Sequence, residues 1–230
     1  MANQMRNAYA LTLLCPIRHG VPAQCPEGLQ GQTCAACVRY LLQDVIRVSV
    51  DSPMARVPNT YLSRFYILED VPYQGKPAIL EHLKNNYLVF CADFHGDPDT
   101  WLAGMWNAIQ PEIRGLLQYC FGFESVDDCA SFVAYIKKCQ VETTFFFDGS
   151  TDEPLAVQLK NLYLKQEFSK FVYANQGRSP EAIQANFQEF VMITQPDNID
   201  APTWKPGAYR LGDVETGLKT KGAGNRFCCK

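Results

Sequence analysis

Two stretches of the chain alternate between apolar and polar side chains, which is the pattern of half-buried β-strands. They cover residues 61–70 and 87–94, and their period of two places neighbouring side chains on opposite faces of a sheet. An apolar run over residues 9–15 predicts another strand. Residues 141–148 are rich in β-branched and aromatic side chains, so a strand is predicted there as well.

Helical periodicity, with apolar residues every three or four positions, marks the segments around these strands. Residues 34–45 follow Thr33 and residues 98–120 follow Asp97, and both residue types cap helix N-termini. Pro111 is expected to kink the second of these helices. Further helices are expected over residues 78–86, 129–136, 155–173 and 180–191.

The order strand, helix, strand, strand, helix over residues 8–120 is that of a ferredoxin-like unit without its last strand. We therefore expect an α+β fold, a ferredoxin-like antiparallel sheet with helices on one face. A degenerate duplication and a dimeric barrel both stay open. Residues 8–193 are expected to form one domain with a more helical second half, 121–193. Residues 194–230 are expected to be an irregular tail, because helical periodicity ends there.

Several polar side chains of the two alternating strands fall on one predicted face. Antiparallel pairing would bring together Arg64, Tyr66, Cys91, Asp93 and His95. Such a mixed face suits a pocket with a few convergent polar groups. Arg64 would bind an anionic or carbonyl oxygen, His95 would act as acid or base, and Asp93 would orient His95. Tyr66 and Cys91 would contact the substrate. In the structural alternative, Arg64 and Asp93 form a buried ion pair and His95 caps the following turn.

Cysteines and histidines raise two further possibilities. Cys34 and Cys37 have the C-x-x-C spacing of metal and redox sites, which Cys15 and Cys25 would complete. Both also fit the apolar stripe of their helix, so we expect buried thiols and predict no metal. Haem ligation needs only one imidazole and stays open, although no cofactor is predicted. The histidines are His19, His82 and His95.

Net charge and hydropathy indicate which binding partners and which cellular compartment to expect. The formal net charge is −3, so no basic field favours nucleic acid. No apolar run is long enough for stable membrane insertion, and no secretory leader is evident at the start of the chain. We therefore expect a cytoplasmic protein with reduced cysteines. Cys228 and Cys229 lie near basic residues in the last stretch, where a solvated tail is expected.

Residues 59–70 (NTYLSRFYILED) and 87–97 (YLVFCADFHGD) resemble paired strands of the dimeric α+β barrel superfamily. The resemblance is to ferredoxin-like modules of proteins related to dye-decolourising peroxidases. Residues 177–183 (GRSPEAI) are similar to a later segment of such proteins, and the resemblance spans residues 8–191. It implies a ferredoxin-like sheet, often doubled or dimerised into a barrel, with a pocket between sheet and helices.

The superfamily includes haem peroxidases, cofactor-free oxygenases and isomerases, and members with no known activity. The peroxidases' G-x-x-D-G signature is absent here, and their haem-ligating histidine has no identifiable counterpart. This departure argues against haem peroxidase activity.

The expected function is therefore small-molecule binding, accessory to an oxidative pathway, with catalysis left open. The ligand would be small and hydrophobic or carbonyl-containing, and the protein a homodimer. One alternative is a cofactor-independent oxygenase or isomerase that uses His95, Asp93 and Arg64. The other is a haem-binding, peroxidase-like protein.

Overall fold

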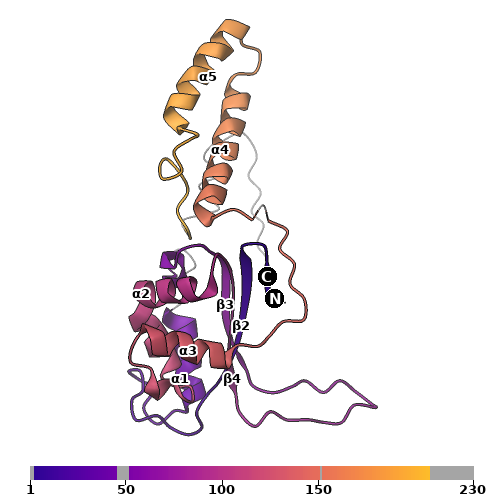
Figure 1. The fold of residues 1–230 in the computed structure, drawn as a ribbon, viewed down its shortest axis with the longest axis vertical. Helices are drawn as coiled ribbons and strands as arrows, with labels where there is room; N and C mark the ends of the chain where they lie inside the picture. Colours follow the sequence, from indigo (N-terminus) through magenta and orange to yellow (C-terminus); the bar gives the residue numbers. More distant parts are fainter. Residues whose placement is uncertain (1–2, 46–51, 151, 208–230) are drawn as a thin grey trace, which may run out of the picture. The chain divides into compact units, whose positions relative to one another are not determined.

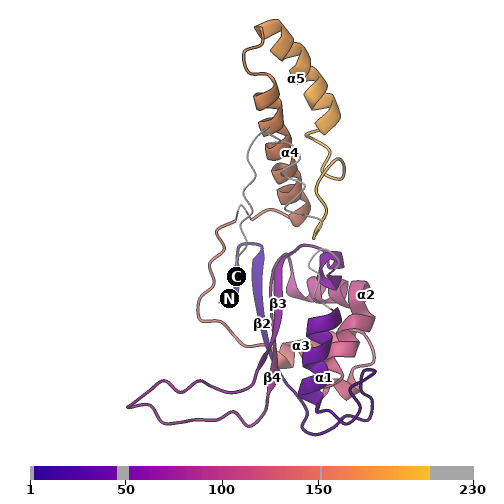
Figure 2. The ribbon, with the colours of Figure 1, turned by 180° about the vertical axis from the view of Figure 1, so that it is seen from behind.

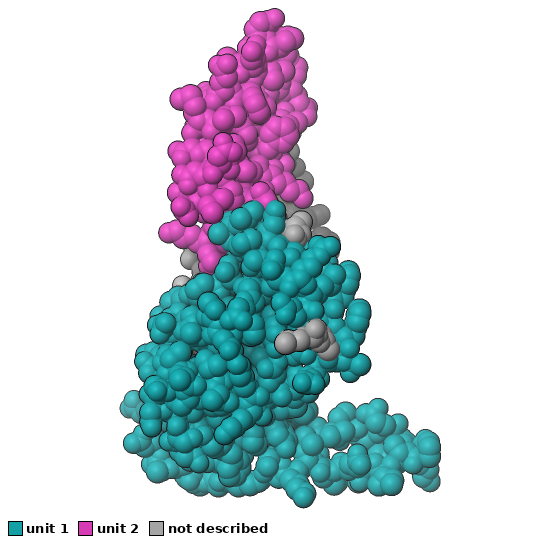
Figure 3. All heavy atoms as spheres, in the orientation of Figure 1, with its two compact units in different colours: residues 1–158 teal, residues 159–230 magenta. Residues whose placement is uncertain are grey.

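The computed structural model describes residues 3–45, 52–150 and 152–207. The chain forms two compact units (Figure 3), unit 1 with residues 1–158 and unit 2 with residues 159–230. Each unit is described by itself. The expectation of one domain over residues 8–193 stays a prediction, because two compact units of one chain can still fold together.

Unit 1 is built on an antiparallel sheet with the strand order β1-β2-β4-β3. Strand β4 pairs with β2 on one side and with β3 on the other, and a bulge interrupts the second pairing between Thr60 and Leu62. The fold is therefore α+β, and three predicted strands are confirmed close to their expected ends. The strands are β1 (Gln4–Met5), β2 (Ala8–Pro16), β3 (Thr60–Leu68) and β4 (Tyr87–His95).

The helices of unit 1 lie on one side of the sheet in both ribbon views (Figures 1 and 2). The side chain of Thr33 accepts a hydrogen bond from Ala36 N, and that of Asp97 accepts one from Thr100 N, so both predicted caps are confirmed. Ile109 leaves helical geometry just before Pro111, which is the expected kink. The helices are α1 (Cys34–Tyr40), continued by a π-helical turn (Leu41–Val45), α2 (Pro98–Leu117) and α3 (Cys129–Cys139), with short 3-10 helices at Pro53–Arg56 and Phe123–Ser125.

The core lies between the sheet and these helices. Alternate side chains of β4 face the helices, and all of them are buried, as the alternation predicts: Leu88, Phe90, Ala92 and Phe94. The rings of Phe94 and Trp101 stack with centroids 4.0 Å apart and an interplanar angle of 2°. The rings of Phe65 and Phe90 stack at 4.2 Å. Aromatic stacking therefore joins α2 and β3 to the central strand.

The predicted strand over residues 141–148 is wrong. Gln140 bridges to Leu13 and Val141 N donates to Thr12 O at 2.9 Å, but the pairing ends there. Residues 141–148 cannot extend this pairing toward the start of β2, because β1 already occupies that part of the same strand edge. Thr143 N donates instead to the Asn3 side chain at 2.8 Å.

The predicted helix over residues 78–86 is also wrong. These residues belong to the long connection between β3 and β4, residues 69–86, which projects from the sheet (Figure 1). Ile79 and Leu80 are 84% and 58% exposed, so a helix here would bury no apolar face. A short helix without such packing is marginal in water.

Unit 2 contains most of a helical hairpin, α4 (Leu155–Ala174) and α5 (Pro180–Thr194). Lys160 is buried, and its Nζ donates to Thr194 O at 2.7 Å and to Pro202 O at 2.9 Å. Residues 195–207 contain no helix or strand. The rest of the expected tail, including Cys228 and Cys229, lies outside the described residues. Across the described ranges, no helix has the length and apolar character needed to cross a membrane.

Candidate functional site

The face of the sheet opposite the helices carries all of the candidate site residues, as the sequence predicts. Strand register pairs Arg64 with Cys91 and Leu62 with Asp93. Side chains alternate along each strand, so one face holds Arg64, Tyr66, Cys91, Asp93 and His95. We call this the open face, because Leu62, Arg64 and Tyr66 are exposed on it.

Arg64 and Asp93 interact through charge without forming an ion pair. A hydrogen bond to the Cys91 side chain raises the pKa of Arg64, and the charge of Asp93 adds to this effect. Burial raises the pKa of Asp93, while the guanidinium of Arg64 opposes the rise. Arg64 is exposed, so the alternative of a buried ion pair is wrong. Arg64 faces Cys91 in the strand register, and among the described residues its guanidinium forms no ion pair, so its donors can meet another acceptor.

His95 lies on the open face but is not oriented by Asp93. Its backbone N donates to Asn59 O at 3.0 Å, and its ring meets that of Tyr61 edge-on, with centroids 6.4 Å apart. Among the described residues, no hydrogen bond joins the imidazole to the Asp93 carboxylate. The catalytic roles of Arg64, Asp93 and His95 therefore stay predictions.

A second acidic residue, Asp148, influences the Asp93 end of the open face. After burial itself, the charge of Asp148 is a cause that raises the pKa of both Asp93 and Tyr61. The pKa of Tyr61 reaches about 12, and its hydroxyl donates to Glu153 O at 2.6 Å. The segment after α3 thus approaches this end of the sheet. Asp148 is the expected end of the predicted strand over residues 141–148, and nothing in the sequence pattern places it near β4.

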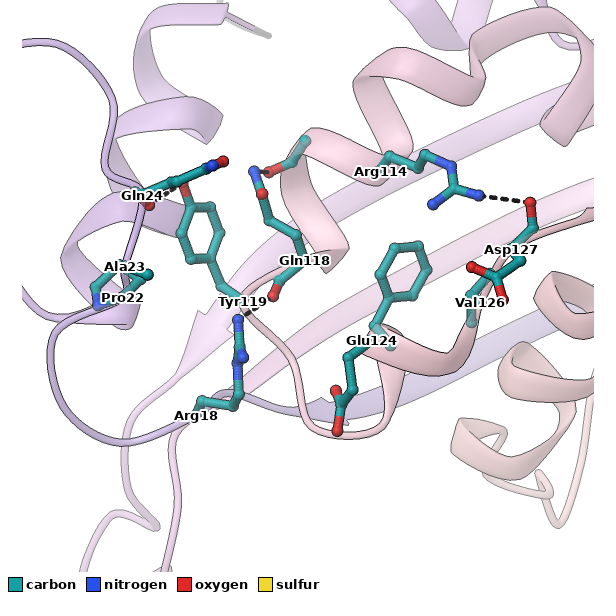
Figure 4. A pocket seen from close by; sticks show the side chains of 12 residues that line it. Arg18, Pro22, Ala23, Gln24, Arg114, Gln118, Tyr119, Glu124, Val126 and Asp127 are labelled. Carbon is teal, nitrogen blue, oxygen red and sulfur yellow. Dashed lines mark hydrogen bonds between the residues drawn. The ribbon is translucent and has the colours of Figure 1, made fainter.

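A separate pocket of about 420 Å³ lies between residues 18–24, the end of α2 and residues 123–127 (Figure 4). Two guanidinium groups line it, those of Arg18 and Arg114. Sequence reasoning missed this pocket too, because its two arginines belong to distant segments without a shared motif.

The three histidines lie in separate surroundings. His82 is exposed, and its Nδ1 lies 2.7 Å from the Asp70 carboxylate. His19 is exposed and meets Phe121 edge-on, and His95 packs against Tyr61. None of the three lines the pocket of about 420 Å³, and haem binding stays a prediction.

The cysteines of the predicted C-x-x-C pair are buried thiols. Cys34 and Cys37 are 2% and 0% exposed, and both are free. Burial raises the pKa of each, that of Cys37 to about 11. In the part of the chain that the structure describes, no group of three or more His, Cys, Asp or Glu side chains is arranged to hold a metal ion.

Cys139 differs from the other thiols and yields a pH-dependent prediction. A hydrogen bond from the Cys15 thiol lowers the pKa of Cys139 to about 7, with help from Tyr135 and Lys138. The thiolate is the nucleophile, so alkylation by iodoacetamide should accelerate as the pH rises through about 7. Cys15→Ala removes the donor, so the pKa of Cys139 should rise and alkylation at pH 7 should slow. Peptide mapping by mass spectrometry gives the rate.

Cys129→Ser is the control for this experiment, since Cys129 is not among the groups that shift the pKa of Cys139. Equal Cys139 alkylation rates in the Cys15→Ala and Cys129→Ser variants would contradict the assigned hydrogen bond.

Comparisons with known proteins found no match: no family model, no curated protein and no solved structure is significantly similar to this chain.

Proposed function

We propose that this protein binds a small hydrophobic or carbonyl-containing molecule on the open face of its sheet. The observation that carries the proposal is the register of β3 and β4, which sets Arg64 beside Cys91 and Leu62 beside Asp93. One guanidinium among apolar side chains can orient a carbonyl or carboxylate oxygen, while the apolar groups supply contact area.

The order of strands and helices in the chain supports the proposal that this sheet belongs to a ferredoxin-like unit. Strands and helices follow the order β2-α1-β3-β4-α2, which matches the first five elements of that unit. One antiparallel bridge joins Gln140 to Leu13 of β2, and this supports the proposal because the last strand of such a unit would pair with β2 in the same direction. We propose that this unit closes into a barrel by pairing its open face with a second copy.

The side chains of the open face define the ligand class. Leu62 and Tyr66 are 58% and 46% exposed, so an apolar molecule can gain contact area against both. Arg64 would donate hydrogen bonds to a carbonyl oxygen of that molecule. Asp93, whose pKa burial raises, would accept or share a proton beside it.

Binding without catalysis is the function that this geometry favours. An oxygenase or isomerase would need an acid–base group aligned with its orienting partner. His95 instead packs on Tyr61 and makes no hydrogen bond to Asp93 among the described residues. The raised pKa of Asp93 beside Arg64 leaves a carboxylate base as the catalytic alternative.

Denaturing the purified protein and analysing the released small molecules by mass spectrometry tests this proposal. The wild type should release one compound in a fixed ratio to the chain. Arg64→Gln should release about tenfold less, because a hydrogen bond to a charged group is lost. Arg56→Gln is the matched control, since Arg56 pairs with Glu112. No released compound, or equal amounts from both variants, would overturn the proposal.

A further inference from the structure

Three cysteines from separate segments of unit 1 come together at the end of β2: Cys15, Cys120 and Cys139. Cys15 belongs to β2 itself. Two antiparallel bridges flank it along the strand, one to Gln140 two positions earlier and one to Cys120 two positions later. Because β4 pairs along the whole of β2, both bridges lie on the other edge of that strand. Cys139, the neighbour of Gln140, is thus held on one side of Cys15 and Cys120 on the other.

Backbone hydrogen bonds fix both of these contacts beside Cys15. They run from Val141 N to Thr12 O at 2.9 Å and from Phe121 N to Pro16 O at 2.8 Å. The three thiols are free but differ in exposure. Cys15 and Cys120 are 1% and 0% exposed, whereas Cys139 is half-buried. A small solute can therefore reach the sulfur of Cys139, while the sulfur of Cys15 is covered.

Tyr135 adds a hydroxyl group to this cluster. It lies one helical turn before Cys139 in α3, so the two side chains share a face of the helix. Tyr135 is 7% exposed, and its ring meets that of Phe123 edge-on, with centroids 5.3 Å apart. Among the described residues, its buried hydroxyl has no nitrogen or oxygen partner. This hydroxyl is available to an oxygen atom that reaches Cys139.

The thiols of the cluster also differ in ionisation. A hydrogen bond from the Cys15 thiol lowers the pKa of Cys139 to about 7, and the same contact, together with burial, raises the pKa of Cys15. Burial raises the pKa of Cys120 to about 12. At pH 7 about half of the Cys139 thiols are therefore ionised, against about 3% of an unperturbed thiol. The cluster thus holds one thiolate next to a thiol that keeps its proton.

We propose that Cys139 and Cys15 form a peroxide-reactive pair, in which Cys139 is the nucleophile and Cys15 is the resolving thiol. The observation that carries the proposal is the placement of a half-buried sulfur and a buried sulfur together on one edge of β2. The substrate is hydrogen peroxide, which is small enough to reach a half-buried sulfur. This pair does not depend on the open face or on its function.

The reaction consumes one peroxide molecule and both thiols. The Cys139 thiolate attacks a peroxide oxygen, so that an S–O bond forms and the O–O bond breaks. The hydroxide that leaves takes up the proton that Cys139 released and becomes water. The Cys15 sulfur then attacks the sulfenic sulfur of Cys139, so that an S–S bond forms, the S–O bond breaks, and a second water leaves with the Cys15 proton. Peroxide is reduced and the two sulfurs are oxidised, and no other reactant is needed.

Treatment of the reduced full-length chain with an excess of hydrogen peroxide tests the proposal. The remaining thiols are blocked with iodoacetamide, and the chain is digested without a reductant. Mass spectrometry should then identify two peptides joined by a disulfide between Cys15 and Cys139. The rate constant for its formation should not depend on the protein concentration, because both sulfurs belong to one chain.

Cys15→Ala should abolish this disulfide and leave Cys139 as a sulfenic acid that dimedone traps. The acid should form more slowly than in the wild type, because the hydrogen bond that favours the thiolate is lost. Cys139→Ser should abolish both the disulfide and the dimedone adduct. Cys129→Ser is the matched control, since Cys129 is also a half-buried thiol of α3, and it should leave the disulfide yield unchanged. Far-UV circular dichroism checks that each variant folds.

Three results would overturn the proposal. The first is the absence of a link between Cys15 and Cys139 in the peroxide-treated wild type, which needs no variant to fold. The second is a link from Cys139 to Cys120 in its place. The third is a dimedone adduct on Cys15 in the Cys139→Ser variant, because Cys15 would then be the nucleophile.

Discussion

Phe94→Ala should lower the free energy of unfolding by about 3–5 kcal/mol. Phe94 is 0% exposed, and its ring lies between those of Trp101, at 4.0 Å, and Tyr9, at 5.3 Å. Truncation would leave a cavity where β2, β4 and α2 meet, and the surrounding rings cannot all collapse into it. Urea unfolding followed by tryptophan fluorescence measures the change.

Phe145→Ala provides the control for this prediction. Phe145 is 80% exposed, so the same truncation should change the stability by no more than about 0.5 kcal/mol. A loss below about 1 kcal/mol for Phe94→Ala, or equal losses for both variants, would contradict the placement of Phe94 in the core.

Leu62→Lys should weaken association of two copies by about 2 kcal/mol or more, roughly thirtyfold in Kd. Leu62 is 58% exposed on the open face. In a twofold interface the same surface meets itself, so two introduced lysines would enter one apolar contact and lose hydration. Sedimentation equilibrium at several concentrations measures the Kd.

Leu80→Lys is a closely matched control, because Leu80 is also 58% exposed but lies on the connection between β3 and β4. It should leave the association unchanged. A wild type that stays monomeric, or equal Kd values for the two variants, would show that the open face does not pair.

The sequence predicts best where local rules and tertiary packing agree. The alternation along β3 and β4 predicts the shared face of Arg64 and Cys91, because antiparallel pairing preserves the period of two. The caps at Thr33 and Asp97 follow from their side-chain oxygens. Both features depend on residues close together in the chain or on one pair of strands.

Prediction from the sequence fails where distant segments compete for one strand edge or come together at one site. Residues 141–148 have strand-like composition, yet β1 holds the adjacent part of the β2 edge, and composition cannot show which segment pairs there. Arg18 and Arg114 line the same pocket only because the fold brings the turn after β2 close to the end of α2. The influence of Asp148 on Asp93 arises in the same way.

We propose that the open face, with Arg64 facing Cys91 and Leu62 facing Asp93, binds a small molecule between two copies of the chain. A native mass spectrum of the full-length protein tests this function most directly, because one measurement reports both the number of chains and the retained molecule. We expect the mass of two chains plus a small-molecule adduct. A spectrum that contains only single chains without an adduct would contradict it.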